Sequence, residues 1–177
     1  MAIKTFTTGE VLTAADTNTY LANSGLVFVK SQTIGTGVSS VAVTNAFNST
    51  YDNYRIVASG GIGSALQAMT MILTGSTASY YQILAYWTYA GAATSAGVNN
   101  GASWAYIGES GDSNTICIDV LNPNKTKYTQ FSGHYIGSVA GTIAGYHGIA
   151  TAYTGFTIAV PNTMTGGTIT VYGYRNG

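Results

Sequence analysis

The sequence TITVYGY, residues 168–174, shows the alternation that decides the fold. Ile169, Val171 and Gly173 fall on one side of an extended chain, while the threonines and tyrosines fall on the other, because successive side chains of a strand point to opposite faces. The run LQAMTMILT, residues 66–74, also alternates, but both of its sides are apolar. Such a run favours a central strand, or one whose outer face is covered by another subunit.

Similar short runs rich in Val, Ile, Thr and Tyr recur along the chain, separated by clusters of Gly, Asn, Asp and Ser. This composition is typical of antiparallel strands joined by turns. About nine to eleven strands are predicted, with candidates at residues 26–33, 37–44, 54–59, 66–74, 80–89, 103–107, 115–121, 127–137, 142–153, 156–160 and 168–174. We therefore expect an all-β domain at residues 26–177, an antiparallel two-sheet sandwich, with a jelly roll as the specific architecture.

Turn-forming residues mark several connections between these strands. Hairpin turns are predicted at residues 99–101 (NNG), 111–112 (GD) and 122–125 (NPNK), where Pro123 pre-sets the backbone angle of a type I turn. The segment AGAATSAGVNNG, residues 90–101, consists mostly of small residues. It predicts a long surface loop.

The chain is poor in charge. Six acidic and six basic residues make up 7% of its 177 residues, against roughly 25% in an average globular protein. So little charge gives weak protection against association, and we expect the protein to work inside an assembly. Without a basic stripe, no nucleic-acid partner is expected. Without an apolar run of roughly 18 residues, no membrane insertion is expected.

Groups that could carry catalysis or bind a metal are few. Glu109 and Asp112 lie in the segment GESGDSN, which we interpret as a polar turn between strands. His134 and His147 fall on strands that could be neighbours, but two histidines alone make no specific metal site. Cys117, in the apolar run TICIDVL, is expected to be a buried small hydrophobe. The sequence predicts no catalytic residue, no metal and no cofactor.

Aromatic residues are in surplus, with 14 tyrosines and two tryptophans. Aromatic rings give large contact areas in cores, in subunit interfaces and against sugars, and all three roles stay open from the sequence. The group predicted to make a glycan or subunit contact flanks the small-residue segment and consists of Tyr80, Tyr81, Tyr86, Trp87, Tyr89, Trp104 and Tyr106.

The first 25 residues do not follow the strand pattern, and residues 1–25 are expected to form an arm with one short helix. Thr13 is placed to cap the helix, Asp16 completes a short capping box, and Gly25 supplies the stop. A helix of about ten residues with this composition is marginal alone. It therefore needs a packing partner, either its own domain or another protein.

The arm resembles the opening of many tailed-bacteriophage virion proteins, in which a segment G-x-V-L-T-A-A-D-x-N precedes a β-rich fibre or jelly-roll domain. Here that segment is GEVLTAADTN, residues 9–18. The stretches YDNYRIVASGG, residues 51–61, and GGTITVYGYRNG, residues 166–177, resemble strands of such domains, and together the similar segments cover about a third of the chain. The residues expected to dock the arm are Phe6, Val11, Leu12, Ala15, Asp16, Asn18, Tyr20 and Leu21.

The resemblance implies a non-enzymatic structural role in a virion, with other virion proteins as partners and a homo-oligomer, commonly a trimer. A tail-side fibre or receptor-binding subunit would attach by the arm and present its distal loops to a host-surface glycan. A capsid decoration protein would instead use the arm to clamp neighbouring capsomers. A free carbohydrate-binding module would explain the tyrosines but not the arm.

Overall fold

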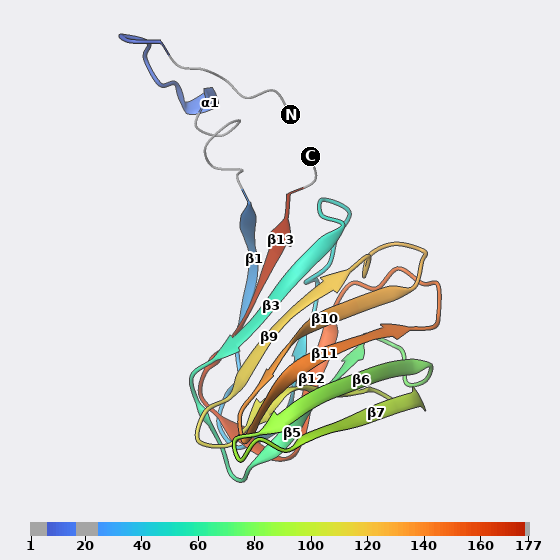
Figure 1. Ribbon diagram of the computed structural model, residues 1–177. Coiled ribbons are helices and arrows are strands. Elements are labelled where there is room, and N and C mark those ends of the chain that lie inside the picture. The colour runs from blue at the N-terminus through green and yellow to red at the C-terminus, as the bar shows by residue number, and fades with distance from the viewer. Residues whose placement is uncertain (1–6, 17–24, 176–177) are drawn as a thin grey trace.

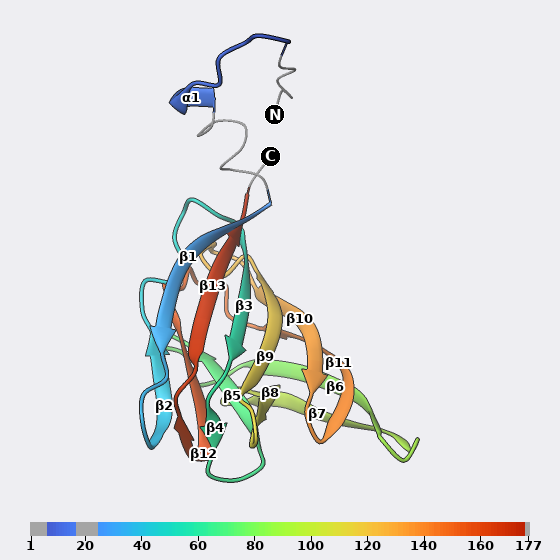
Figure 2. The same cartoon turned by 90° about the vertical axis from the view of Figure 1, so that its left-hand side faces the viewer.

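The computed structural model describes residues 7–16 and 25–175, and the body that follows the arm is all-β (Figures 1 and 2). Its antiparallel strands form a two-layer sandwich, as the sequence predicts, while the stricter expectation of a jelly roll stays a prediction. The elements are α1 (Ala14–Asp16), β1 (Leu26–Thr33), β2 (Val38–Val43), β3 (Asn53–Ser59), β4 (Ile62–Gly63), β5 (Gln67–Leu73), β6 (Tyr80–Thr88), β7 (Ala93–Gly101), β8 (Trp104–Ser110), β9 (Thr115–Leu121), β10 (Thr129–Ile136), β11 (Val139–His147), β12 (Phe156–Thr165) and β13 (Thr168–Tyr174).

The two layers differ in size. The larger has the strand order β1-β13-β3-β9-β10-β11-β6-β7, and the smaller has the order β2-β12-β5-β8, with β4 paired to the end of β12. β8 and β9 share only two register pairs, Gly108 with Ile116 and Glu109 with Thr115. This hairpin carries the chain from one layer to the other, so that each layer has an inner face on the shared core and an outer face.

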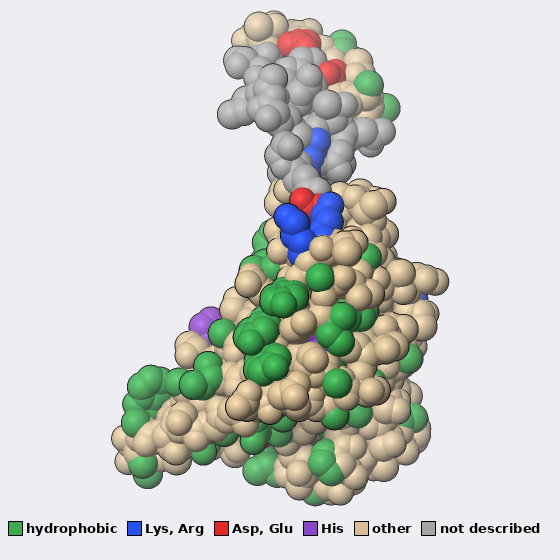
Figure 3. All heavy atoms as spheres, turned by 90° about the vertical axis from the view of Figure 1, so that its right-hand side faces the viewer, with side chains coloured by type: hydrophobic (Ala, Val, Ile, Leu, Met, Phe, Trp, Pro, Cys, Tyr) green, Lys and Arg blue, Asp and Glu red, His purple; other side chains and the backbone are tan. Residues whose placement is uncertain are grey.

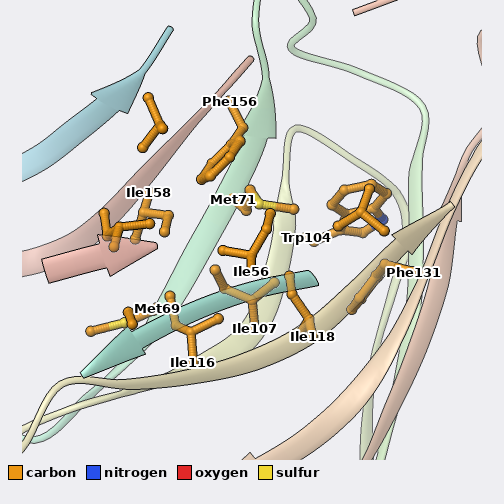
Figure 4. Close-up of a cluster of buried hydrophobic side chains, with 14 of the residues drawn as sticks. Ile56, Met69, Met71, Trp104, Ile107, Ile116, Ile118, Phe131, Phe156 and Ile158 are labelled. Atoms are coloured by element: carbon orange, nitrogen blue, oxygen red, sulfur yellow. The ribbon is translucent and has the colours of Figure 1, made fainter. Parts of the chain in front are cut away.

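The core lies between the layers because strand alternation turns one set of apolar side chains inward. Ile169 and Val171 of β13 are buried, as are Met69, Met71 and Leu73 of β5. The residues between them are more exposed, so the alternation predicted from the sequence is confirmed. Figure 4 shows how side chains from both layers meet in this core.

Trp104 is fully buried and packs against two other rings. Its ring centroid lies 5.2 Å from that of Tyr80, edge to face, and 4.5 Å from that of Phe131. The Tyr80 hydroxyl accepts a hydrogen bond from the Leu73 amide at 2.7 Å and donates one to the Ser76 carbonyl at 3.1 Å. Because its polar tip is satisfied, the tyrosine ring can belong to the core without a desolvation penalty.

Each predicted strand overlaps an observed one, and β1, β9 and β13 have the predicted bounds, but the strand predicted at residues 142–153 runs past the end of β11 at His147. The prediction of a loop at residues 90–101 is wrong, because this segment contains β7, which pairs antiparallel with β6. The chain turns at residues 102–103 instead of 99–101. An edge strand has one hydrogen-bonding neighbour and little to bury, so small residues suffice there despite their low strand preference. The two-residue β4 is likewise not predicted.

The other two predicted turns are present. Residues 111–112 lie between β8 and β9. At residues 122–125 the Lys125 amide donates a hydrogen bond to the Asn122 carbonyl at 3.2 Å, which closes the turn around Pro123.

Candidate functional site

The outer face of the larger layer exposes a group of aromatic and aliphatic side chains where β6, β11 and β10 run side by side. Tyr81 pairs with Tyr146 across β6 and β11, and Ile83 pairs with Ala144. The row of Ile83 and Ala144 continues onto β10, where Ser132 pairs with Ala144. Since residues opposite one another in a sheet share a face, these side chains form neighbouring rows on the outside of the sandwich.

Three tyrosines stack across this face. The rings of Tyr81 and Tyr146 are within 7° of parallel, with centroids 4.6 Å apart. Tyr128, just before β10, stacks on Tyr146 at 6.1 Å and 20°. Because β11 lies between β6 and β10, Tyr146 has a neighbouring ring on either side. The middle of the stack therefore offers ring edges and hydroxyl groups to a partner, not an open ring face.

An open groove beside this stack, here named the trough, has a volume of about 610 Å³. It crosses β7, β6, β11, β10 and β9. Gly145 lies on the inner side of β11 beneath it, where a Cβ would meet the buried Phe131 ring at 2.6 Å. None of the residues that line the trough is acidic or basic. Prominent lining residues are Tyr81, Ile83, Val98, Gln130, Ser132 and Tyr146.

Farther along the same strands, Trp87, Ala140 and Ile136 form one row across β6, β11 and β10, here named the Trp87 patch. Trp87 is 53% exposed and Ile136 is 55% exposed. Trp87 lies four residues beyond Ile83 on the same side of β6, which is about 13 Å along a strand. The face thus carries a groove and a separate apolar projection.

The structure places two of the seven predicted aromatic contact residues in the core. Tyr80 and Trp104 are fully buried, so neither can touch a glycan or a subunit, and that part of the prediction is wrong. In the run YYQILAYWTY aromatic residues occupy both alternating sets, so the sequence does not reveal which set faces inward. The other five are partly buried against the core (Tyr86, Tyr106) or reach the surface (Tyr81, Trp87, Tyr89).

The sequence did not single out Ile83, Tyr128, Ile136 or Tyr146, although all four belong to this face. Ile83 and Tyr146 join it because β6 and β11 pair over nine positions, and Ile136 and Tyr128 join it because β10 pairs with the other edge of β11. The alternation within each strand carries a weak signal. Which strand pairs with which decides the rows of side chains on the sheet, and neither the sequence of β6 nor that of β11 alone predicts this pairing.

The described part of the arm caps a helix in the predicted way. The Asp16 amide donates to Thr13 Oγ1 at 3.1 Å, and the Thr13 amide donates to the Asp16 carboxylate at 3.2 Å. Both halves of the capping box are therefore formed. Helix α1 is described over Ala14–Asp16, and the rest of the predicted helix lies outside the described residues.

Apolar side chains of the arm face solvent. Val11 is 78% exposed and Leu12 is 50% exposed, and Ala15 is exposed as well. Isolated apolar residues are common on surfaces, and here two adjacent ones lie on a segment outside the core. The remaining predicted docking residues, Phe6, Asn18, Tyr20 and Leu21, lie outside the described residues.

His147, at the end of β11, is fully buried. Its Nε2 lies 2.7 Å from Ser76 Oγ and 3.0 Å from the Ala78 carbonyl oxygen, and its ring packs against those of Tyr80 and Tyr153 at 4.5 and 5.3 Å. Burial lowers the pKa of His147, because the charged imidazolium loses hydration. Both members of the Ser–His pair are closed off from solvent, so we interpret the cluster as structural.

The two histidines do not meet. His134 is exposed and pairs with Thr142, whereas His147 pairs with Thr129. Cys117 is also exposed, so the expectation of a buried thiol is wrong. The reason is strand alternation: Ile116 and Ile118 on either side fill the inward positions of β9 and turn Cys117 to the outer face.

Glu109 and Asp112 likewise do not form a pair. Asp112 is exposed, in agreement with a polar turn, but Glu109 is buried. The Glu109 carboxylate accepts hydrogen bonds from the Tyr135 hydroxyl at 3.0 Å, the Ser138 hydroxyl at 2.6 Å and the Ser138 amide at 2.5 Å. Burial, and then the negative charge of Glu109, raise the pKa of Tyr135. These bonds tie β8 to the turn between β10 and β11.

A hydrogen-bonded ion pair lies on the outer face of β3 and β9. Arg55 donates to both carboxylate oxygens of Asp119, at 2.8 and 2.7 Å, and the Tyr174 hydroxyl donates to the same carboxylate at 2.6 Å. Burial by itself raises the pKa of Asp119, but the hydrogen bonds from Arg55 and Tyr174 lower it below its ordinary value. The pair neutralises itself and leaves little net charge on this part of the sheet.

Long parts of the body contain no charge at all. Residues 56–108 and 128–174 include no Asp, Glu, Lys or Arg. On the face shown in Figure 3, the blue and red side chains of the body lie at the end next to the arm, and hydrophobic side chains appear over the rest. Among residues 26–175 the charged side chains therefore fall within residues 30–55 and 109–127 and at residue 175, and the long stretches between them are uncharged.

Within the ranges that the structure describes, no three His, Cys, Asp or Glu side chains gather closely enough to hold a metal ion. The same ranges contain no helix with the length and apolar character needed to cross a membrane. Comparison with protein-family models, curated proteins and solved structures found no match for this chain.

Proposed function

We propose that this chain is a non-enzymatic structural protein of a bacteriophage virion, a tail-side appendage that docks through residues 1–25 and displays its β-sandwich. The observation that carries the proposal is the exposed pair Val11 and Leu12, which lies within the segment GEVLTAADTN that resembles phage virion openings. The capping box beside the pair supports an arm that is partly ordered before it meets a partner.

The homo-oligomer is part of the same proposal. Its support is the uncharged outer face of β6, β7, β10 and β11, because copies of a protein repel one another least where they carry no charge. A trimer is the state that the phage resemblance favours. The body then supplies self-association, and the arm supplies attachment to other virion proteins.

The order of the strands supports the jelly-roll expectation for the displayed domain. β1, β3, β9 and β13 lie together in the larger layer, and β2, β5, β8 and β12 form the smaller one. Each set combines strands that are far apart in the chain, in the orders β1-β13-β3-β9 and β2-β12-β5-β8. Interleaved orders of this kind arise from the Greek keys of a jelly roll, with β10, β11, β6 and β7 as an extension of one sheet.

The arm is tested in the full chain by the double substitution Val11→Asp and Leu12→Asp. We expect the variant to fold but to be lost from purified virions when it replaces the parent chain during assembly, because a docked apolar pair cannot accommodate two carboxylates. Thr8→Asp, also on the exposed arm, is the matched control and should incorporate normally. Normal incorporation of the double variant would contradict docking through this segment.

The placement in the virion is tested by electron microscopy of particles that carry a labelled chain. Label on the tail supports the proposal. Label spread over the head would contradict it and would favour the capsid decoration role.

A further inference from the structure

We propose that the outer face of β6, β10 and β11 is the contact between copies of this chain, with the trough of one copy receiving the Trp87 patch of the next. The proposal rests on the homo-oligomer part of the proposed function and assigns it a surface. Neither the arm nor the placement in the virion enters the argument.

Charge is the first reason for choosing a second copy as the occupant. β6, β7, β10 and β11 contain no Asp, Glu, Lys or Arg. A face of this kind meets an identical face without like-charge repulsion, whereas a strongly charged partner would find no complementary group. His134 is the one titratable side chain on the exposed side of these four strands apart from tyrosines.

The exposed area is the second reason. Ile83 is 58% exposed, close to the values for Trp87 and Ile136 on the same face. Four strands of about nine residues cover on the order of 570 Å² before side-chain relief is counted. A stable contact buries about 800 Å² on each partner. The four strands alone therefore supply most of that area when the whole face is covered, and large apolar patches on proteins usually mark such contacts.

The geometry of the tyrosine stack argues for a protein occupant over a sugar. A sugar ring packs best on an open aromatic face, but Tyr146 has rings on both sides, at 4.6 Å from Tyr81 and 6.1 Å from Tyr128. The trough instead offers aliphatic walls and ring edges. An aromatic anchor seated in such a groove is the usual centre of a protein interface.

The trough and the Trp87 patch occupy different parts of one face. A contact that joins these two regions is isologous when two copies make it reciprocally about a two-fold axis. It is heterologous when each copy receives one neighbour and inserts into another, and heterologous contacts close into a ring when the rotation between copies allows. The proposed trimer is such a ring. Each copy then both gives and receives one contact, and no trough is left open.

Light scattering on the purified full chain tests the proposal. The parent chain is expected at a multiple of 18.3 kDa, the mass of one copy. Two single variants, Ile83→Glu and Ser132→Glu, are each expected at 18.3 kDa, because a carboxylate buried without a partner would break the contact between copies. Their circular dichroism spectra should be unchanged, because both side chains are exposed in the single chain. Ser40→Glu, at an exposed position on β2 of the other layer, is the matched control and should keep the parent mass.

Trp87→Ala is expected to weaken association at least about tenfold if the indole is the anchor. A parent chain that is monomeric at its highest soluble concentration would overturn both this proposal and the proposed homo-oligomer. An oligomer that survives both glutamate variants would overturn only the assignment of the face. Binding of a neutral oligosaccharide to a monomeric parent chain, abolished by Ile83→Glu, would overturn the proposal in favour of a glycan groove.

Discussion

The arm and the sandwich are held in shape by interactions of different range. In the arm, hydrogen bonds link Thr13 to Asp16 and Thr7 to Glu10, three residues apart. In the sandwich, β1 pairs with β13 and β2 pairs with β12, so contacts join the two ends of the chain. Local bonds of the first kind stabilise a segment only weakly. Non-local packing of the second kind makes a domain cooperative.

This difference suggests a division of labour. The core of the body is formed entirely by its own strands, so we expect the body to fold without the arm. The arm is then free to serve attachment. The uncharged outer face of β6, β7, β10 and β11 is a second surface that the fold does not require. If the division holds, changes in the body should alter stability in proportion to burial, and changes in the arm should alter attachment alone.

The largest expected effect is that of Trp104→Ala. This change removes a fully buried ring that packs on Tyr80 and Phe131, and we expect the free energy of unfolding to fall by about 3–5 kcal/mol. The matched change in the arm is Leu12→Ala, where the side chain is half exposed. It should cost less than about 0.5 kcal/mol. Urea denaturation of both variants measures the contrast, and equal losses would break the comparison.

A smaller effect, dependent on pH, is expected at His147. Its pKa is lowered from 6.5 in the folded chain, so the unfolded chain binds the proton more readily. The free energy of unfolding should therefore fall as the pH drops below about 6.5 and level off below the folded pKa. His147→Gln should cost about 1–3 kcal/mol at neutral pH, because buried hydrogen bonds are lost.

The control for this effect is the slope of stability against pH, measured by thermal unfolding between pH 7 and pH 5. The parent chain should show a decrease in this window that His147→Gln lacks. A variant that keeps the parent slope would mean that another group is responsible, and the assigned role of the buried imidazole would then be wrong.

Arg55→Ala is expected to have the smallest effect among changes in the body. The Arg55 and Asp119 side chains are 37% and 28% exposed, so solvent screens the pair and its loss should cost about 1 kcal/mol or less. Chemical denaturation measures the loss, with Lys30→Ala, at a half-buried position on β1 where the ammonium donates to the Thr44 carbonyl, as a reference for the loss of a single surface hydrogen bond. A loss near that of Trp104→Ala would contradict the view that stability resides in the core.

Much of the fold could be predicted from alternation alone. The runs that became β1, β9 and β13 have correct bounds because each combines β-branched residues with clear turn signals. β7 could not be predicted, because AGAATSAGVNNG has the composition of a loop and becomes a strand only by pairing with β6. Its structure is set by a neighbour and not by its own residues.

The candidate site was predicted less well than the fold. Trp87 and Tyr81 were expected at a contact and do lie at the surface, but Trp104 proved to be a core residue. Whether an aromatic residue faces inward depends on the register of its strand, and a shift of one position reverses it. Tyr146 became part of the site through the pairing of β11 with β6, a contact between distant segments.

The division between arm and body is tested most directly by deletion of residues 1–25, with stability and virion incorporation measured on the same truncated chain. The account predicts a folded sandwich whose free energy of unfolding is within about 0.5 kcal/mol of the parent value and which no longer enters particles. A truncated chain that incorporates normally, or one that fails to fold, would contradict it.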